Sequence, residues 1–137
     1  MNAAEAALAE IADEFSFFTD WEERYAHVLD LGRALEPLSA AEHNEHTKVR
    51  GCASQVWLVS DAKDGKLYFR GDSDAHLVRG LIAVLLRIFS GRTPQEIQSV
   101  PPETVFSRIG LADALTPQRS NGLHAMMQRI QREAAST

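Results

Sequence analysis

The chain has 137 residues, of which 45% are hydrophobic and 24% charged, so we expect one globular domain over residues 1–137. Its net charge of −5, with no stripe of lysine and arginine, argues against a nucleic-acid partner. The sequence begins with acidic residues, unlike a signal peptide, and its longest apolar run is too short to span a membrane. We therefore expect a cytoplasmic protein that does not enter a membrane.

Two helices are predicted at the N-terminus. Apolar residues at helical spacing indicate the first over residues 3–15. Asp20 is placed to cap the second, Pro37 ends it, and residues 38–47 read as an exposed polar loop. The apolar face expected for the second helix comprises Trp21, Tyr25, Val28, Leu29 and Leu35.

A β-hairpin is predicted next. Residues 55–60 and 66–71 are rich in β-branched and aromatic side chains, and Asp64-Gly65 between them favours a tight turn. Both faces of the first strand are apolar, so we expect that strand to be covered on both sides. A largely apolar helix over about residues 75–90 follows, capped by Asp72, Ser73 or Asp74 and lying across the sheet.

The remaining third of the chain reads as further helices. Thr93, Pro94 and Glu96 form a capping box with proline at the first helical position. Residues 103–115 suggest short helical pieces broken at Gly110, and Thr116 would cap the last helix. Its apolar stripe comprises Leu123, Met126, Met127 and Ile130. Together these elements predict an α+β fold, with a small antiparallel sheet of two or three strands packed with flanking helices.

The chain contains one cysteine, Cys52, placed between a polar loop and the first strand. It cannot form a disulfide within the chain, which suits a reducing compartment. Gly51 permits a positive φ and open access, while Lys48 and Arg50 bring positive charge that favours the thiolate. Ser54 and Gln55 supply hydrogen-bonding groups. The alternative is a small, buried and unreactive cysteine.

Several kinds of cysteine chemistry are open to such a residue. A protease would need a histidine base, and no motif marks one. A metal site built from His43, His46 and Cys52 lacks a clear fourth ligand, so two exposed loop histidines are the simpler interpretation. An accessible thiol without a triad suits a sulfur carrier. A stand-alone thiol enzyme (a peroxidase or hydrolase) and a purely regulatory binding partner remain alternatives.

One segment, VRGCASQVWLV at 49–59, resembles the signature of the SufE/CsdE family, sulfur acceptors that partner cysteine desulfurases in iron–sulfur cluster assembly. The resemblance runs from about residue 13 to the C-terminus. It implies an α+β fold like that of iron–sulfur scaffold proteins such as IscU, which carry three cysteines. Further segments match in the same order, namely WEERY at 21–25, GDSDAHLVRGLIAVL at 71–85, TPQEI at 93–97 and LTPQRSNGL at 115–123.

The resemblance implies that Cys52 takes persulfide sulfur from a desulfurase and stimulates that enzyme. The partner would be a SufS- or CsdA-like desulfurase that holds pyridoxal phosphate, whereas this chain would bind no cofactor. A scaffold such as SufBCD would receive the sulfur. Asp74 and Arg119 are expected to support the cysteine loop, and Trp57 and Leu58 to line a cavity or simply the strand core. Relatives often carry a polar residue at the position of Ala53, and we expect a monomer.

Overall fold

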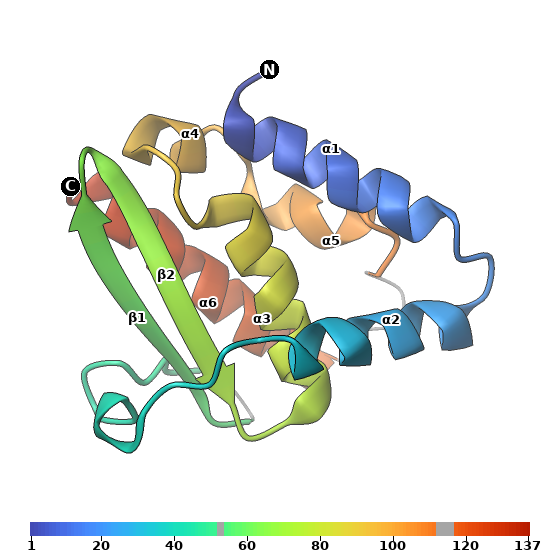
Figure 1. Ribbon diagram of the computed structural model, residues 1–137, viewed down its shortest axis with the longest axis horizontal. Coiled ribbons are helices and arrows are strands. Elements are labelled where there is room, and N and C mark those ends of the chain that lie inside the picture. The colour runs from blue at the N-terminus through green and yellow to red at the C-terminus, as the bar shows by residue number, and fades with distance from the viewer. Residues whose placement is uncertain (52–53, 112–116) are drawn as a thin grey trace.

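The computed structural model describes residues 1–51, 54–111 and 117–137, and for residues 117–122 it describes the backbone alone. Helices precede and follow a β-hairpin, as the sequence predicts for an α+β protein (Figure 1). The elements are α1 (Ala3–Ser16), α2 (Trp21–Arg33), η1 (Ala40–Glu42), β1 (Val56–Lys63), β2 (Lys66–Ser73), α3 (His76–Phe89), α4 (Pro94–Gln98), η2 (Pro102–Thr104), α5 (Val105–Arg108) and α6 (Pro117–Ala135).

Side-chain caps fix where the first two helices begin. Asn2 and Glu5 form a capping box at the start of α1. Asp20 caps α2 by accepting a hydrogen bond from the backbone N–H of Glu23, as predicted. The apolar face predicted for α2 is only partly buried, because Trp21 and Tyr25 are each 37% exposed. The prediction is wrong for Trp21 and Tyr25 but right for Val28, which is buried together with Gly32.

The helices α2 and α3 cross at glycine residues, which brings their backbones close together. A Cβ added at Gly80 would lie 2.0 Å from the carbonyl oxygen of Val28, and one added at Gly32 would lie 2.7 Å from the nitrogen of Gly80. Neither position has space for a side chain. The crossing therefore holds α2 in one place against the central helix.

The hairpin forms at the predicted turn. Strands β1 and β2 pair antiparallel, from Val56↔Ser73 at one end to Lys63↔Lys66 at the other. Asp64 and Gly65 have φ values of 53° and 77°, which is the conformation of a type I′ turn. Both strands extend beyond their predicted limits. An isolated bridge between Lys48 and Trp57 adds a short third segment, consistent with the predicted two or three strands.

One face of the sheet packs on α3 and α6. A Cβ at Gly71 would touch Ile82 of α3 and Met126 of α6, so both helices lie directly beneath that strand. The outer face carries Trp57 and Val59, which are only half-buried, so the prediction that β1 is covered on both sides is wrong. Residues 38–47 cover this face at one end of the sheet only. The inner face buries Val56, Leu58, Leu67 and Phe69.

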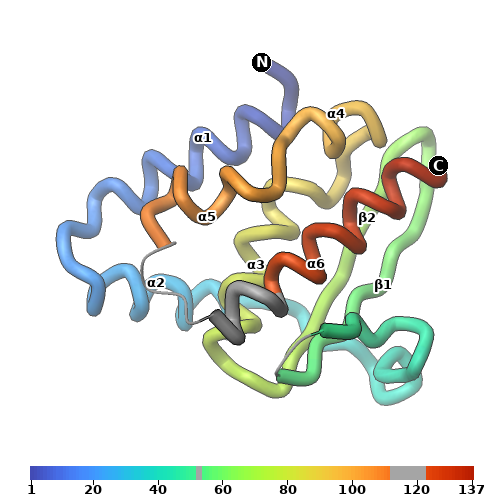
Figure 2. The backbone as a smooth tube through the Cα atoms, turned by 180° about the vertical axis from the view of Figure 1, so that it is seen from behind, coloured from blue at the N-terminus to red at the C-terminus, as the bar shows by residue number. Residues whose placement is uncertain are grey.

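The C-terminal helices complete the core (Figure 2). Thr93 and Glu96 form the predicted capping box of α4, and Gly110 ends the short helical pieces with a φ of 75°. The predicted stripe of α6 is buried, and the expected cap at Thr116 lies outside the described residues. Among the described residues, no helix is both long enough and apolar enough to cross a membrane. The stripe comprises Leu123, Met126, Met127 and Ile130.

Candidate functional site

The segment around Cys52 is joined at both ends to the sheet. The Val49 N–H donates to the Val56 carbonyl oxygen at 2.8 Å, and the Leu58 N–H donates to that of Thr47 at 2.7 Å. We call residues 50–55, which connect these paired segments, the cysteine loop. Cys52 and Ala53 lie outside the described residues, whereas both flanks of the loop are described.

Gly51 supplies the backbone conformation at the entry to the cysteine loop. Its φ of +88° lies in the left-handed region, where a side chain would add strain. A Cβ there would lie 3.6 Å from the Cβ of Ala125 in α6, which is ordinary contact. The glycine is therefore required by backbone conformation rather than by lack of space.

Asp74 holds the exit of the cysteine loop. Its carboxylate Oδ1 accepts a hydrogen bond from the Gln55 N–H at 3.0 Å, and its own N–H donates to the Gln55 carbonyl oxygen at 3.3 Å. The predicted cap of the long helix by Asp72, Ser73 or Asp74 is wrong, because α3 begins after Ala75 and has no side-chain cap. The Asp74 carboxylate binds the cysteine loop instead.

Arg129 of α6 anchors the segment that leads into the cysteine loop, which passes beside α6 (Figure 2). Its guanidinium donates to the carbonyl oxygens of Lys48 at 3.0 Å and of His46 at 2.6 Å. Sequence reasoning missed this residue. Its partners are backbone groups 81 and 83 positions away, so no local pattern could have indicated it.

A buried carboxylate lies at the same end of the sheet, on the outer face, where Asp72 pairs with Trp57 across the strands. Asp72 is 6% exposed, and its oxygens accept hydrogen bonds from the Arg79 guanidinium and from the backbone N–H groups of Ser73 at 2.8 Å and Leu38 at 3.4 Å. His43 Nε2 lies 3.0 Å from Asp72 Oδ2. This carboxylate therefore joins residues 38–43 to the sheet and to α3. Each group bonded to it offsets part of the free energy needed to remove its charge from water.

His43 also covers Trp57. The two rings meet edge to face with their centroids 4.5 Å apart, which explains why Trp57 is half-buried on the outer face. His43 Nδ1 lies 2.8 Å from the Ser39 carbonyl oxygen, so both ring nitrogens face protein acceptors. Leu58 faces the other way, into the core. Of the two residues expected to line a cavity or the strand core, Leu58 belongs to the core.

A second ion pair ties residues 38–47 to the outer face of β2. The Arg70 guanidinium donates to both carboxylate oxygens of Glu42, and the Ser39 N–H donates to Glu42 Oε1 at 3.0 Å. The hydrogen bonds from Arg70 and from the Ser39 backbone lower the pKa of Glu42 to about 2. The carboxylate therefore remains charged well into the acidic range.

The other predicted site residues have different surroundings. Arg50 pairs with Glu45 on the surface, where both side chains are largely exposed, and Ser54 is half-buried. The side chain of Arg119 lies outside the described residues. Of the predicted site residues, the structure thus brings together Gln55, at the exit of the cysteine loop, and Asp74.

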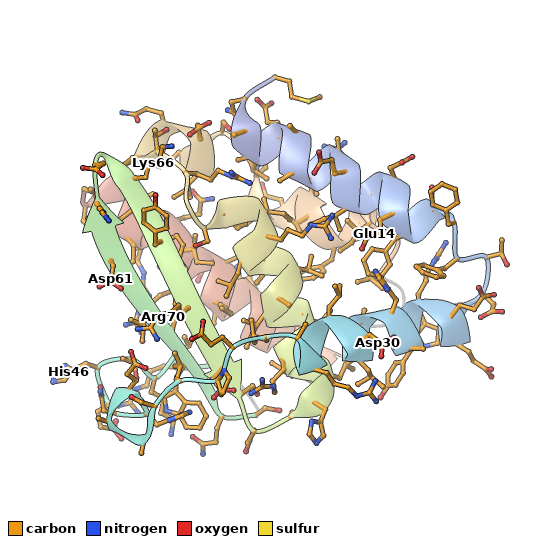
Figure 3. The ribbon with its side chains drawn as sticks, viewed as in Figure 1. Glu14, Asp30, His46, Asp61, Lys66 and Arg70 are labelled. Atoms are coloured by element: carbon orange, nitrogen blue, oxygen red, sulfur yellow. The ribbon has the colours of Figure 1, made fainter. Side chains whose placement is uncertain are left out.

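The metal site considered from the sequence has little support from the histidines. Both ring nitrogens of His43 face protein acceptors, and His46 is exposed and points away from the molecule (Figure 3). Apart from residues 52–53 and 112–116, which are not described, no three His, Cys, Asp or Glu side chains are grouped to hold a metal ion.

Comparisons with known proteins find one family over most of the chain. The profile of the family described as "SufE: Fe-S metabolism associated domain" matches residues 9–134. The chain is 47% identical over 133 residues to a SufE-like protein of Rhizobium etli, covering 94% of this chain and 90% of that protein. A SufE-like protein of Synechocystis is 40% identical over 127 residues, with coverages of 93% and 79%.

A solved structure shares the fold. The solution structure of a hypothetical protein from Thermus thermophilus superposes with a TM-score of 0.77 at 24% sequence identity. The match covers 96% of this chain and 97% of that one. It supports the α+β architecture over almost the whole length of the chain.

Proposed function

The chain belongs to the SufE family, whose members act in iron–sulfur metabolism, and from this premise we propose that Cys52 accepts sulfur from a cysteine desulfurase. Family membership implies a desulfurase as the partner. The observation that carries the proposal is the anchoring of both flanks of the cysteine loop. This loop holds the chain's only cysteine.

The proposed reaction is a transfer of sulfane sulfur between two thiols. The Cys52 thiolate attacks the terminal sulfur of a cysteine persulfide on the desulfurase, and a new S–S bond forms as the old one breaks. The desulfurase cysteine leaves as a thiolate, and Cys52 becomes the persulfide. No electrons are gained or lost overall, so the step requires no oxidant or reductant.

The residues around the cysteine loop have simple roles in this proposal. Gly51 provides the left-handed turn before Cys52, and Asp74 fixes the backbone of Gln55 three residues after it. Arg50 pairs with Glu45 in the free protein. When the desulfurase binds and this pair opens, Arg50 contributes positive charge near the thiol. In the loaded state we expect Arg119 to contact the loop and Ser54, within the loop, to supply a hydrogen bond.

The wider features of the proposal follow the family. The chain acts as one SufE-like domain over residues 1–137, as a monomer in the cytoplasm, and stimulates the desulfurase by unloading it. Pyridoxal phosphate belongs to the SufS- or CsdA-like partner, and this chain holds no cofactor of its own. A scaffold of the SufBCD kind receives the sulfur.

The direct test is the intact mass of the protein after incubation with an active cysteine desulfurase and L-cysteine, followed by peptide mapping. We expect a species one sulfur atom heavier, with the addition on Cys52 and removed by a thiol reductant. The Cys52→Ser variant should gain no sulfur and should not stimulate the desulfurase.

Two other outcomes would replace the proposal. Stimulation that persists in Cys52→Ser, without persulfide on the wild type, would indicate regulation by binding alone. Turnover of peroxide or ester substrates by the isolated protein, lost in Cys52→Ser, would indicate a stand-alone thiol enzyme.

A further inference from the structure

The outward face of α2 carries an apolar ridge, which we define as the exposed residues Trp21 and Tyr25 and the half-buried Leu29. These residues are spaced four apart and so follow one line along the helix. The rings of Trp21 and Tyr25 meet edge to face with centroids 6.2 Å apart, and both side chains are exposed. The core does not use them, so their role has to be sought at the surface.

The ridge ends in a groove between α2 and α3. The groove has a volume of about 250 Å³ and lies where Gly32 and Gly80 bring the two helices together. Leu29 belongs to both the ridge and the groove, so the two form one continuous surface. The groove is lined by Leu29, Gly32, Arg33, His76 and Arg79.

The rim of this groove favours an acidic group. Arg33 is 72% exposed, and its pairing with Asp30 on the same helix is a surface contact of the kind that contributes little to stability. His76 stands at the first position of α3. The charge of Arg79 is already balanced by buried Asp72, which leaves Arg33 available to a carboxylate from outside.

The groove lies close to the cysteine loop along the chain. His76 follows Asp74 by two residues, and the Asp74 carboxylate is bonded to Gln55 at the exit of that loop. Figure 1 shows the start of α3 beside the end of β2, on the side where α2 ends. A protein that brings a persulfide to Cys52 therefore approaches the same end of the molecule.

We propose that the α2 ridge and its groove dock the cysteine desulfurase, by receiving an amphipathic segment with apolar side chains and a carboxylate. The apolar side chains lie on Trp21, Tyr25 and Leu29, and the carboxylate faces Arg33 and His76. This inference rests on the proposed function, since it names where the same partner binds. Aromatic and arginine side chains are the residues that most often dominate binding at interfaces.

The test is the affinity for a cysteine desulfurase that loads the wild type, measured by calorimetry on the full chain. We expect the double variant Trp21→Ala/Tyr25→Ala to raise Kd at least about tenfold. Arg33→Glu should raise Kd about fivefold, with a loss that shrinks as salt concentration rises. Saturating desulfurase should restore persulfide formation in both variants, because Cys52 and its loop are unchanged.

Matched controls exist elsewhere on the chain. Tyr68→Ala removes an aromatic ring of similar exposure from β2. Arg132→Glu reverses an exposed arginine in the last turn of α6, as Arg33→Glu does in the last turn of α2. Both controls should bind like the wild type, and the urea midpoints of all variants should show that they fold.

The outcomes separate the docking site from the function. If the wild type accepts sulfur but the α2 variants bind as tightly as the controls, the docking site is wrong and the proposed function stands. If the wild type accepts no sulfur from any active desulfurase, the proposed function itself fails. Wild-type self-association that is lost in the α2 variants, with desulfurase affinity unchanged, would assign the ridge to a second copy and overturn the proposal.

Discussion

The two ends of the β-hairpin differ in what holds them. At the turn end, Asp64 and Gly65 adopt positive φ values, and the surrounding residues, including Asp61 and Lys66, are exposed (Figure 3). At the loop end, where Val56 pairs with Ser73, polar side chains hold the backbone and one another in place. Asp74 and Arg129 bind backbone groups, while His43 and Arg79 meet the buried carboxylate of Asp72.

This contrast separates a local structure from an assembled one. The conformation of the turn end is set by Asp64 and Gly65 alone, because a type I′ turn matches the twist of the strands it joins. The loop end exists only once α3, α6 and residues 38–47 have packed. Functional chemistry that depends on a fixed backbone is therefore expected at the loop end, and stability measurements can test the difference.

The largest effect is expected at the buried carboxylate. Asp72→Ala removes four hydrogen-bonding contacts, one of them the carboxylate that balances the charge of Arg79, so we expect a loss of about 3 kcal/mol in unfolding free energy. Asp61→Ala at the exposed part of β1 should change stability by less than about 0.5 kcal/mol. Urea unfolding measures both, and equal losses would contradict the contrast between the two ends.

The next effect is expected at the anchor from α6. Arg129→Ala removes two charge-assisted hydrogen bonds to the segment before the cysteine loop, and we expect a loss of about 2 kcal/mol. Persulfide loading should slow as well. Arg129→Lys should recover only part of the loss, since one ammonium lacks the planar fork that reaches both carbonyl oxygens. Arg132→Ala is the control, and a similar loss there would count against the anchor.

A smaller effect is expected at Asp74, where hydrogen exchange can report on the cysteine loop alone. Asp74→Ala should cost about 1 kcal/mol and speed hydrogen exchange at the Gln55 amide, which loses its acceptor. Asp74→Asn keeps an acceptor oxygen and should restore part of the protection. Gly65→Ala should also cost about 1 kcal/mol, through strain at positive φ, without accelerating exchange at Gln55 or slowing persulfide loading. Unchanged Gln55 exchange in Asp74→Ala would contradict the assigned role.

The smallest effect is a pH dependence at Glu42. Its pKa is lowered to about 2 in the folded protein, from an ordinary value of 4.5, so its contribution is fully present above about pH 4.5. That contribution is lost as the pH falls from about 4.5 towards 2. Urea midpoints of wild type and Glu42→Gln should differ most near neutral pH and converge in acid. A constant difference would show that the ion pair with Arg70 does not contribute in this way.

Much of the fold was predictable because its signals are local. Three predicted features involve only residues within four positions of one another, and each forms as predicted. They are the Asp20 cap, the Asp64-Gly65 turn and the Thr93–Glu96 capping box. The cap of α3 was mispredicted because an aspartate before a helix can either cap the helix or bind another segment. Asp74 matches a helix cap in sequence, yet its carboxylate binds Gln55, 19 positions earlier.

The candidate site was predictable only in part. The resemblance around Cys52 identified the loop, but the groups that hold it lie far away in sequence. Arg129 and His43 bind backbone or side-chain partners that periodicity cannot reveal. The burial predicted for Trp21 and Tyr25 was wrong for a different reason. Helical spacing shows that the two residues share a face of the helix, but it does not show whether that face meets the core or the solvent.

The glycine crossing of α2 and α3 has a consequence for partner choice. Because the backbones meet directly at Gly32 and Gly80, the two helices have little freedom to slide, so the α2 ridge and Asp74, which binds the exit of the cysteine loop, keep a fixed separation. A partner attached at one of them holds its second contact at a high effective concentration near the other. Two contacts of modest strength then act together, and only a protein with both features at the matching spacing gains from the pair.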